Sequence, residues 1–342
     1  MKKIVLLFVV VLSSLGQSFG QFKMPYSEDW ILASKLPIVV VLKEKDVKRV
    51  EKLTKNGKIE ELEMYNASVE DYNNYIKKYV EIYWDKELIH AYMTDSEFKK
   101  FEEDRKNKKK YTFISSKYNN NSSKAHRKAQ ANGVFSDNAN FTNNTQISFG
   151  IVGVKFPMTD NALAVQFFPD LDQGFFKNSK KHAFRESDLK FCVKYFKNYM
   201  NEISATDTKL EKMSNKEKVA YMNRNAKELK QLTLLVDKDL VSEAFLKEFK
   251  EKYKFKYELV DAERVEKAIL NNEEGYAYFH NHFQPGMNGT NYNLLHVYET
   301  KNLKMLYFTY PKGQTGIKLG VFTVRPGSKI NDVNELIEAI EM

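Results

Sequence analysis

The sequence has 342 residues, a formal net charge of +9 and a single cysteine, Cys192. This length suffices for one large domain or two of ordinary size. One cysteine excludes an intramolecular disulfide bond, so stability must come from the packed core, to which aromatic residues contribute 13% of the chain. The charge is modest and lysine alternates with glutamate along most expected helices, so we expect no nucleic-acid partner.

Residues 1–20 have the three parts of a cleavable secretory signal peptide. Two lysines form the positive start, and Ile4–Leu12 is an uninterrupted apolar run. Small residues at Ser18 and Gly20 fit a signal peptidase, which predicts cleavage before Gln21. The alternative is an uncleaved membrane anchor, but a span needs about 20 apolar residues. We therefore expect an exported protein, periplasmic or extracellular, with no transmembrane segment in the mature chain.

Strand and helix patterns divide the mature chain into four segments. Residues 21–117 and 231–342 alternate apolar strands with amphipathic helices, which predicts α/β units with a mainly parallel sheet. Residues 118–145, rich in asparagine, serine and lysine, predict an exposed linker. Residues 146–230 predict a hairpin followed by connecting helices.

The first unit opens with the apolar run Ile38–Leu42, which is typical of a strand buried on both faces. The pattern then predicts a helix over Lys43–Leu53, a strand over Lys58–Met64 and a helix that begins at Ser68. A helix and a strand complete this unit at Ser96–Arg105 and Tyr111–Ile114.

The connecting region begins with a hairpin expected at Ile147–Phe156 and Ala162–Phe168. Helices are expected over 187–203 and 214–229, and the second opens with a Ser-x-x-Glu capping box. Cys192 falls on the apolar face of the first of these helices. We therefore expect its thiol to be buried in the core rather than reactive.

The second unit repeats the pattern of the first. Strands are expected at Leu232–Val236, Phe255–Val260 and Gly275–His280, with helices over Val241–Lys252 and after a capping Asp261. The C-terminal part then adds strands and a closing helix, with antiparallel strands expected to extend the second sheet: Tyr292–Glu299, Leu303–Tyr310, Ile317–Val324 and a helix capped by Asn331.

The stretches 39–53 and 233–249 share an apolar strand, an acid-Lys-Asp turn and an amphipathic helix. We interpret this likeness as a diverged internal duplication; the alternative is that any two βαβ units look alike in this way. The expected fold class is therefore α/β, with two βαβ-type units and added antiparallel strands in the C-terminal part.

The candidate site is the segment that holds Tyr278, His280 and His282, followed after a loop by His296. Residues two apart in a strand share a face, so His280 and His282 can converge on one transition metal ion such as zinc, copper or iron. If the two strands pair, an even sum of partner numbers puts His296 on that face, and an odd sum does not. The four residues can also contact a ligand without metal. The structural alternative is two histidines at a strand end beside a loop that are merely hydrogen-bonded or exposed, and no acidic ligand is obvious in the same stretch.

Motifs for dinucleotide binding, serine hydrolases and zinc proteases do not occur. Export without a catalytic signature favours a non-catalytic binding or interaction protein, whose partner is an unknown small molecule, peptide or envelope protein. We expect no cofactor unless the histidine strand binds metal. Two alternatives are a metal-dependent enzyme that uses that strand and a structural or assembly component of the cell envelope. Open α/β sheets bind ligands beyond the carboxyl ends of their strands. In this sequence those ends are expected in the loops that follow Leu42, Val236 and His280.

Overall fold

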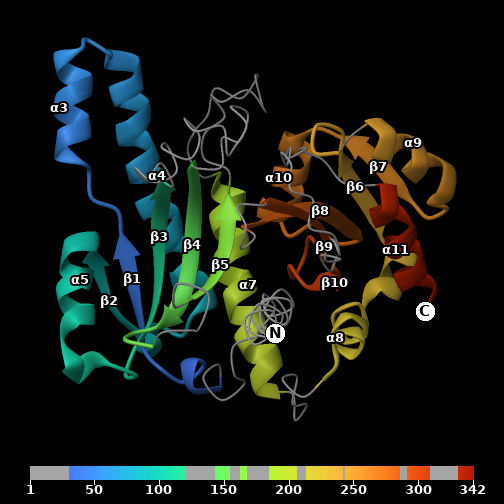
Figure 1. Cartoon of the computed structure of the whole chain (residues 1–342), viewed down its shortest axis with the longest axis horizontal. Helices are drawn as coiled ribbons and strands as arrows, with labels where there is room; N and C mark the ends of the chain where they lie inside the picture. The colour runs from blue at the N-terminus through green and yellow to red at the C-terminus, as the bar shows by residue number, and fades with distance from the viewer. Residues whose placement is uncertain are drawn as a thin grey trace, which may run out of the picture.

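The computed structural model describes residues 31–120, 143–154, 162–167, 185–205, 213–241, 243–285, 291–308 and 330–342. They form an α/β chain with two mixed sheets, as the sequence predicts (Figure 1). The expected signal peptide, most of the expected linker and the expected strand over Ile317–Val324 lie outside the described residues.

The first sheet has the strand order β2-β1-β3-β4-β5. Its first strand in the chain, β1 (Ile38–Leu42), pairs in parallel with β2 (Ile89–Thr94) and β3 (Thr112–Asn120). Two antiparallel strands, β4 (Asn143–Ile151) and β5 (Ala162–Phe167), extend the sheet beyond β3. β1 is rich in β-branched residues because side chains on both of its faces are buried.

The second sheet has the strand order β10-β9-β8-β6-β7. Its first strand in the chain, β6 (Thr233–Asp237), pairs in parallel with β7 (Tyr257–Val260) and β8 (Tyr276–Pro285). The antiparallel strands β9 (Asn291–Glu299) and β10 (Met305–Tyr307) extend it.

Both sheets are built by the same path of the chain. In each, the first strand lies between the second and third strands and parallel to both, and the fourth and fifth strands follow antiparallel beyond the third. Helices connect the three parallel strands, and a helix follows the fifth strand in chain order. The same topology therefore occurs twice, which is what an internal duplication predicts.

The crossovers of the two units differ in length. In the first unit, α3 (Val47–Lys55) and α4 (Ile59–Tyr83) connect β1 to β2, and α5 (Asp95–Glu103) connects β2 to β3. In the second unit, the corresponding helices are α9 (Glu243–Lys252) and α10 (Ala262–Leu270). Asp261 caps α10 as predicted, by accepting from the backbone N–H of Arg264. Short 3-10 helices lie at Lys86–Leu88 and Arg105–Asn107.

The predicted strand over Lys58–Met64 is wrong, because these residues belong to the start of α4. Glu60 and Glu61 lie in its first turn, where good helix formers with negative charge stabilise a helix. The edge strand β2 was not predicted. Most of its side chains are only half-buried, so it lacks the apolar run that marks β1.

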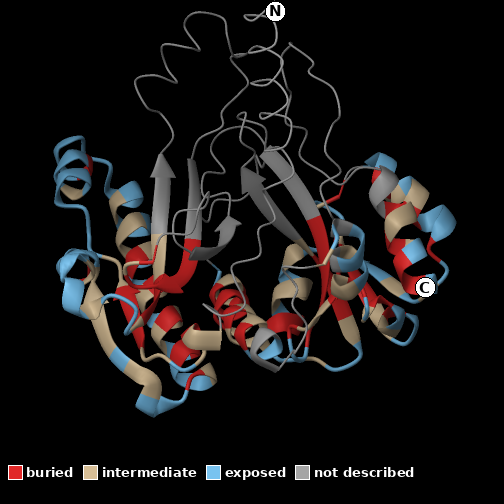
Figure 2. Cartoon of the chain, turned by 60° about the horizontal axis from the view of Figure 1, so that its bottom comes forward, coloured by how far each residue is buried: buried red, intermediate tan, exposed pale blue. Residues whose placement is uncertain are grey.

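The long helix α7 (Glu186–Ala205) lies between the two sheets (Figure 1). The largest core cluster contains side chains of the first sheet, α4, α7 and the second sheet. Cys192 lies in this cluster with no exposed surface, as predicted. Figure 2 shows buried residues along both sheets and on helices between them. The two units therefore share one core, and α7 is its middle layer.

Two further clusters cover the outer faces of the sheets. On the second sheet, Phe245 and Phe249 of α9 pack with Leu336 of α11 (Ile330–Glu341). On the first sheet, Phe98 of α5 packs with Phe113 of β3. Each sheet is thus covered on both faces, as expected for α/β units.

Several boundaries differ from the predictions. Tyr118 pairs with Thr145, so both ends of the expected linker lie in strands, and the β4–β5 hairpin belongs to the first sheet rather than to a connecting region. The helix expected over 214–229 ends early: α8 (Asn215–Met222) has the predicted capping box and is followed by the 3-10 helix η6 (Ala226–Lys230). The closing helix begins before Asn331, which therefore lies inside it.

Within the described parts of the chain, no helix is long and apolar enough to cross a membrane.

Candidate functional site

The register of β8 and β9 settles the position of two of the three predicted histidines. His280 lies directly opposite His296 in the antiparallel pair, and the sum of their numbers is even. The backbone of His282 pairs with Leu294 two positions further along, but the side chain of His282 is outside the described residues. The register thus meets the condition for His280 and His296 to share a face.

Both of these rings pack among aromatic side chains. His280 stacks on Phe191 of α7, with 4.1 Å between ring centroids, and lies edge-on to Tyr298 at 5.9 Å. The pKa of His280 is lowered to about 3, mainly by burial and in smaller part by the nearby His296 and Arg185. His296 is 3% exposed and meets Phe308 edge-on at 4.6 Å. His280 is therefore neutral at physiological pH, and its ring is half-buried among aromatic side chains.

Tyr278, the fourth predicted ligand contact, is 1% exposed and belongs to the shared core. Its hydroxyl is buried and has no hydrogen-bond partner among the described residues. Burial raises the pKa of Tyr278, and the carboxylate of Asp188 adds to that rise. In the described residues no group of three His, Cys, Asp or Glu side chains could hold a metal ion. A metal site on β8 therefore remains a prediction that depends on His282.

A polar stripe on α7 connects this helix to the second unit. Its first member, Lys190, is 2% exposed and donates to the backbone carbonyls of Ile269 and Leu270, at 2.7 and 2.9 Å. These carbonyls lie in the last turn of α10, where a helix has too few donors of its own. A buried ammonium group thus joins the two helices by charge-assisted hydrogen bonds.

The stripe continues at intervals of four residues, which is the spacing of one helix face. Lys194 donates to the carbonyl of Lys301 at 2.9 Å, and Asn198 donates to the carbonyl of Asn302 at 2.8 Å. Both acceptors lie in the turn between β9 and β10. The next residue of the stripe, Glu202, forms an ion pair with Arg224 just beyond α8.

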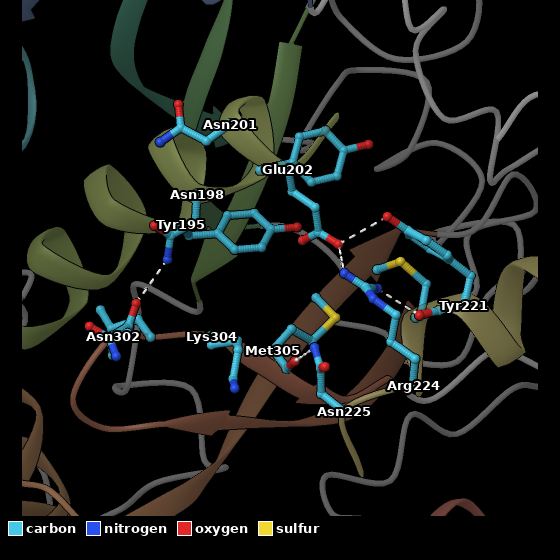
Figure 3. A pocket seen from close by; sticks show the side chains of 13 residues that line it. Tyr195, Asn198, Asn201, Glu202, Tyr221, Arg224, Asn225, Asn302, Lys304 and Met305 are labelled. Carbon is cyan, nitrogen blue, oxygen red and sulfur yellow. Dashed lines mark hydrogen bonds and ion pairs between the residues drawn. The ribbon is translucent and has the colours of Figure 1, made fainter. Parts of the chain in front are cut away.

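A cavity of about 290 Å³ lies at the Glu202 end of this stripe (Figure 3). It is bounded by α7, by the segment from α8 to η6, and by the start of β10 with the turn before it. The lining residues combine tyrosine rings with amide and charged groups: Tyr195, Asn198, Tyr199, Asn201, Glu202, Tyr221, Met222, Arg224, Asn225, Asn302, Leu303, Lys304 and Met305.

The charged centre of the cavity is fixed by several contacts. The Glu202 carboxylate accepts from Arg224 and also from the hydroxyl of Tyr221, at 3.3 Å. Arg224 donates in addition to the backbone carbonyl of Tyr221 at 2.7 Å, and its guanidinium lies 4.0 Å from the centre of the Tyr221 ring. Figure 3 shows these three side chains meeting. The cation and the carboxylate are therefore held in a defined geometry.

Two further groups shape the wall. Asn225 donates to the carbonyl of Met305 at 3.3 Å, and Lys304 forms an ion pair with Glu228. Burial raises the pKa of Tyr195, and the Glu202 carboxylate raises it further, so its hydroxyl stays protonated at neutral pH. Aromatic faces beside hydrogen-bonding and charged groups suit a small organic molecule that has both apolar and polar parts.

Comparison of the chain with protein-family models, curated proteins and solved structures found no match.

Sequence reasoning missed the cavity. One signal was present: Lys190, Lys194, Asn198 and Glu202 recur every four residues in a predicted helix whose other face is apolar. Such a stripe is usually read as solvated, and only the tertiary structure shows that it meets carbonyls of a distant turn. Arg224 and Tyr221 carry no comparable signal.

Proposed function

We propose that the chain is an exported, non-catalytic binding protein that holds a small organic ligand in the cavity between α7 and the second unit. The supporting observation is the Glu202–Arg224 pair, fixed by Tyr221 and set beside tyrosine rings in one concave site. A ligand that carries hydrogen-bonding groups and an apolar face matches this lining. Export is supported by the signal-like pattern of residues 1–20.

Thermal unfolding with a panel of sugars, amino acids, dipeptides and aromatic acids tests this proposal. A ligand present at 100 times its dissociation constant stabilises by about 2.7 kcal/mol, which is a rise in Tm of several degrees. The Glu202→Gln and Tyr221→Phe variants should reduce that rise. Lys227→Met, on the exposed side of η6, is the matched control and should keep it.

Absence of any stabilisation, or a rise that is equal in wild type and Glu202→Gln, would contradict the proposal. If the protein instead co-purifies in a large envelope complex and no small molecule stabilises it, the chain is a structural or assembly component.

A metal-dependent function on β8 is the second candidate, and one observation favours it: His280 and His296 lie opposite each other in register. Metal analysis of untagged protein tests it. A metal site predicts close to one equivalent of metal, lost in a His280→Ala/His282→Ala variant. Metal below about a tenth of an equivalent, unchanged in the variant, would exclude a one-ion site.

A further inference from the structure

The turn between β9 and β10 forms one wall of the cavity and is held from two directions. The hydroxyl of Thr300 donates to the carbonyl of Glu273 and, at 3.0 Å, to that of Tyr276 at the start of β8. From the other direction, Lys194 and Asn198 of α7 donate to the carbonyls of the next two turn residues. A wall that is fixed in this way is preorganised for a ligand.

Leu303, in the same turn, has a backbone conformation that leucine rarely adopts. Its φ is 51°, in the left-handed region that disfavours a residue with a Cβ atom. The side chain is 1% exposed and belongs to the shared core. Such a conformation persists only where the surroundings over-determine it, and these positions concentrate at binding sites. This strained turn favours a built cavity wall over an incidental gap between elements.

The cavity has room for a ligand of modest size. Its volume is about 290 Å³, at the lower end of the range for ligand pockets. A water molecule takes about 30 Å³ in the liquid, so this is the space of about ten waters. A single sugar ring is of this size.

The charged residues of the lining are all engaged in ion pairs. Glu202 pairs with Arg224 and also accepts from the hydroxyl of Tyr221, and Lys304 pairs with Glu228. A ligand with a net charge has to compete with one of these pairs. A guanidinium has five N–H donors and a carboxylate has about four acceptor positions, so both can bond to uncharged hydroxyl groups without separating. The electrostatics therefore favour a neutral ligand.

Asparagine amides supply most of the uncharged hydrogen-bonding groups of the lining: Asn198, Asn201, Asn225 and Asn302. Asn198 and Asn225 each donate to a backbone carbonyl of the opposite wall, which fixes the orientation of their amides. An amide offers donors and an acceptor and carries no charge. A hydroxyl group also both donates and accepts, so a ligand with several hydroxyl groups can bond to these amides in either direction.

Tyrosine rings supply the apolar part of the lining. Tyr195 and Tyr199 lie one turn apart on α7, with 6.2 Å between ring centroids. In Figure 3 the Glu202–Arg224 pair lies between Tyr195 and Tyr221. A sugar ring carries C–H groups on its faces and hydroxyl groups around its edge. It can therefore lie against a tyrosine ring while its edge reaches the polar groups.

We propose that the cavity binds a neutral monosaccharide. This inference rests on the proposed function and adds the class of ligand. The sugar ring lies against tyrosine, and its hydroxyl groups bond to the asparagine amides and to the intact Glu202–Arg224 pair. A uronic acid or an amino sugar has the same ring but adds a charge, so the paired lining discriminates against it.

Calorimetric titration of the protein tests the proposal with glucose, galactose, mannose and N-acetylglucosamine, each beside a charged counterpart: glucuronate, galacturonate, mannuronate and glucosamine. At least one neutral sugar should bind, and its charged counterpart should bind at least about tenfold more weakly. Glu202→Gln keeps the shape of the side chain but leaves Arg224 without its anion. This variant should bind the neutral sugar several-fold more weakly and lose most of its discrimination against the uronic acid. Lys227→Met is the matched control and should keep both, and circular dichroism checks that the variants are folded.

The outcomes separate the ligand class from the cavity itself. If no neutral sugar binds but an amino acid, a dipeptide or an aromatic acid does, the sugar assignment is overturned and the cavity remains a binding site. If none of these compounds binds, the proposed function is contradicted as well. Equal affinity for a neutral sugar and its uronic acid in the wild type, or unchanged discrimination in Glu202→Gln, would overturn the role of the ion pair.

Discussion

The two units share one chain path but differ in what covers their equivalent positions. Lys43 and Lys238 each follow the first strand of a sheet, and an aspartate follows the neighbouring second strand in register with each of them. The crossover above Lys43 includes α4, which has 25 residues, whereas the second unit crosses over through α9, which has 10. A repeated topology thus places the same residue types twice, but Lys43 is half-buried whereas Lys238 is exposed.

The helices that follow the two sheets differ as well. α7 has 20 residues and packs in the core that both sheets share, whereas α11 has 12 residues and packs in the outer cluster of the second sheet. The polar stripe of α7 adds contacts to the turns of the second unit. We therefore expect changes in α7 to affect both units together, and changes around α9 to affect mainly the second.

The largest effect is expected from Phe196→Ala in α7. Phe196 has no exposed surface and stacks on Phe149 of the first sheet at 5.6 Å. Truncation should cost about 3–5 kcal/mol of unfolding free energy and speed amide exchange in both sheets. Phe245 of α9 is equally buried, so Phe245→Ala is the matched variant. It should speed exchange in the second sheet more than in the first. The same exchange pattern in both variants would refute this difference.

A smaller loss is expected from Lys190→Met. The change removes a buried donor from two carbonyls of α10 and should cost about 1–3 kcal/mol in chemical denaturation. Lys194→Met, which removes one more exposed bond of the same stripe, should cost less than about 1 kcal/mol. If the two variants lose equal stability, the buried contact is not what joins α7 to α10.

Helix caps of the two units should respond differently. Asp46 caps α3 and Asp261 caps α10, and replacing either by alanine removes about 1 kcal/mol of local helix stability. Only Asp261→Ala should lower global stability, because α10 packs in the shared core while α3 buries a single residue, Leu53. A similar fall in the denaturation midpoint for Asp46→Ala would contradict this distinction.

Another difference between the units concerns pH. The pKa of Lys43 is about 8 in the folded chain and 10.5 in its ordinary state, so between these values the unfolded chain binds more protons. The stability contributed by Lys43 should therefore rise as pH increases from 8 to 10.5. The stability difference between wild type and Lys43→Met measures this slope, with Lys238→Met as the matched control. Equal slopes in the two variants would count against it.

The predictable part of the fold follows from local patterns. β1 and β6 are apolar runs, and Ser214 and Asp261 carry capping signals, so their elements were predicted from sequence. The edge strand β2 was missed because half-buried strands lack such a run. The start of α4 was misread as a strand, although its glutamates and the three-residue spacing of Ile59 and Leu62 favour a helix.

The candidate site was harder to predict than the fold. An even sum of partner numbers was the condition for His296 to share a face with His280. Only the register of β8 and β9 shows that this condition is met. Sequence could not show that Phe191 stacks on His280, because the two lie in elements far apart in the chain. The cavity depends on the turn before β10 meeting α7, a contact that no local pattern encodes.

The central claim, a ligand cavity between α7 and the second unit, is tested most directly by hydrogen exchange with and without the ligand that raises Tm most. Bound ligand should slow exchange in three separate segments, 195–202, 221–225 and 302–305, and leave α3 unchanged. Protection that is confined to other segments, such as β8, would contradict the claim.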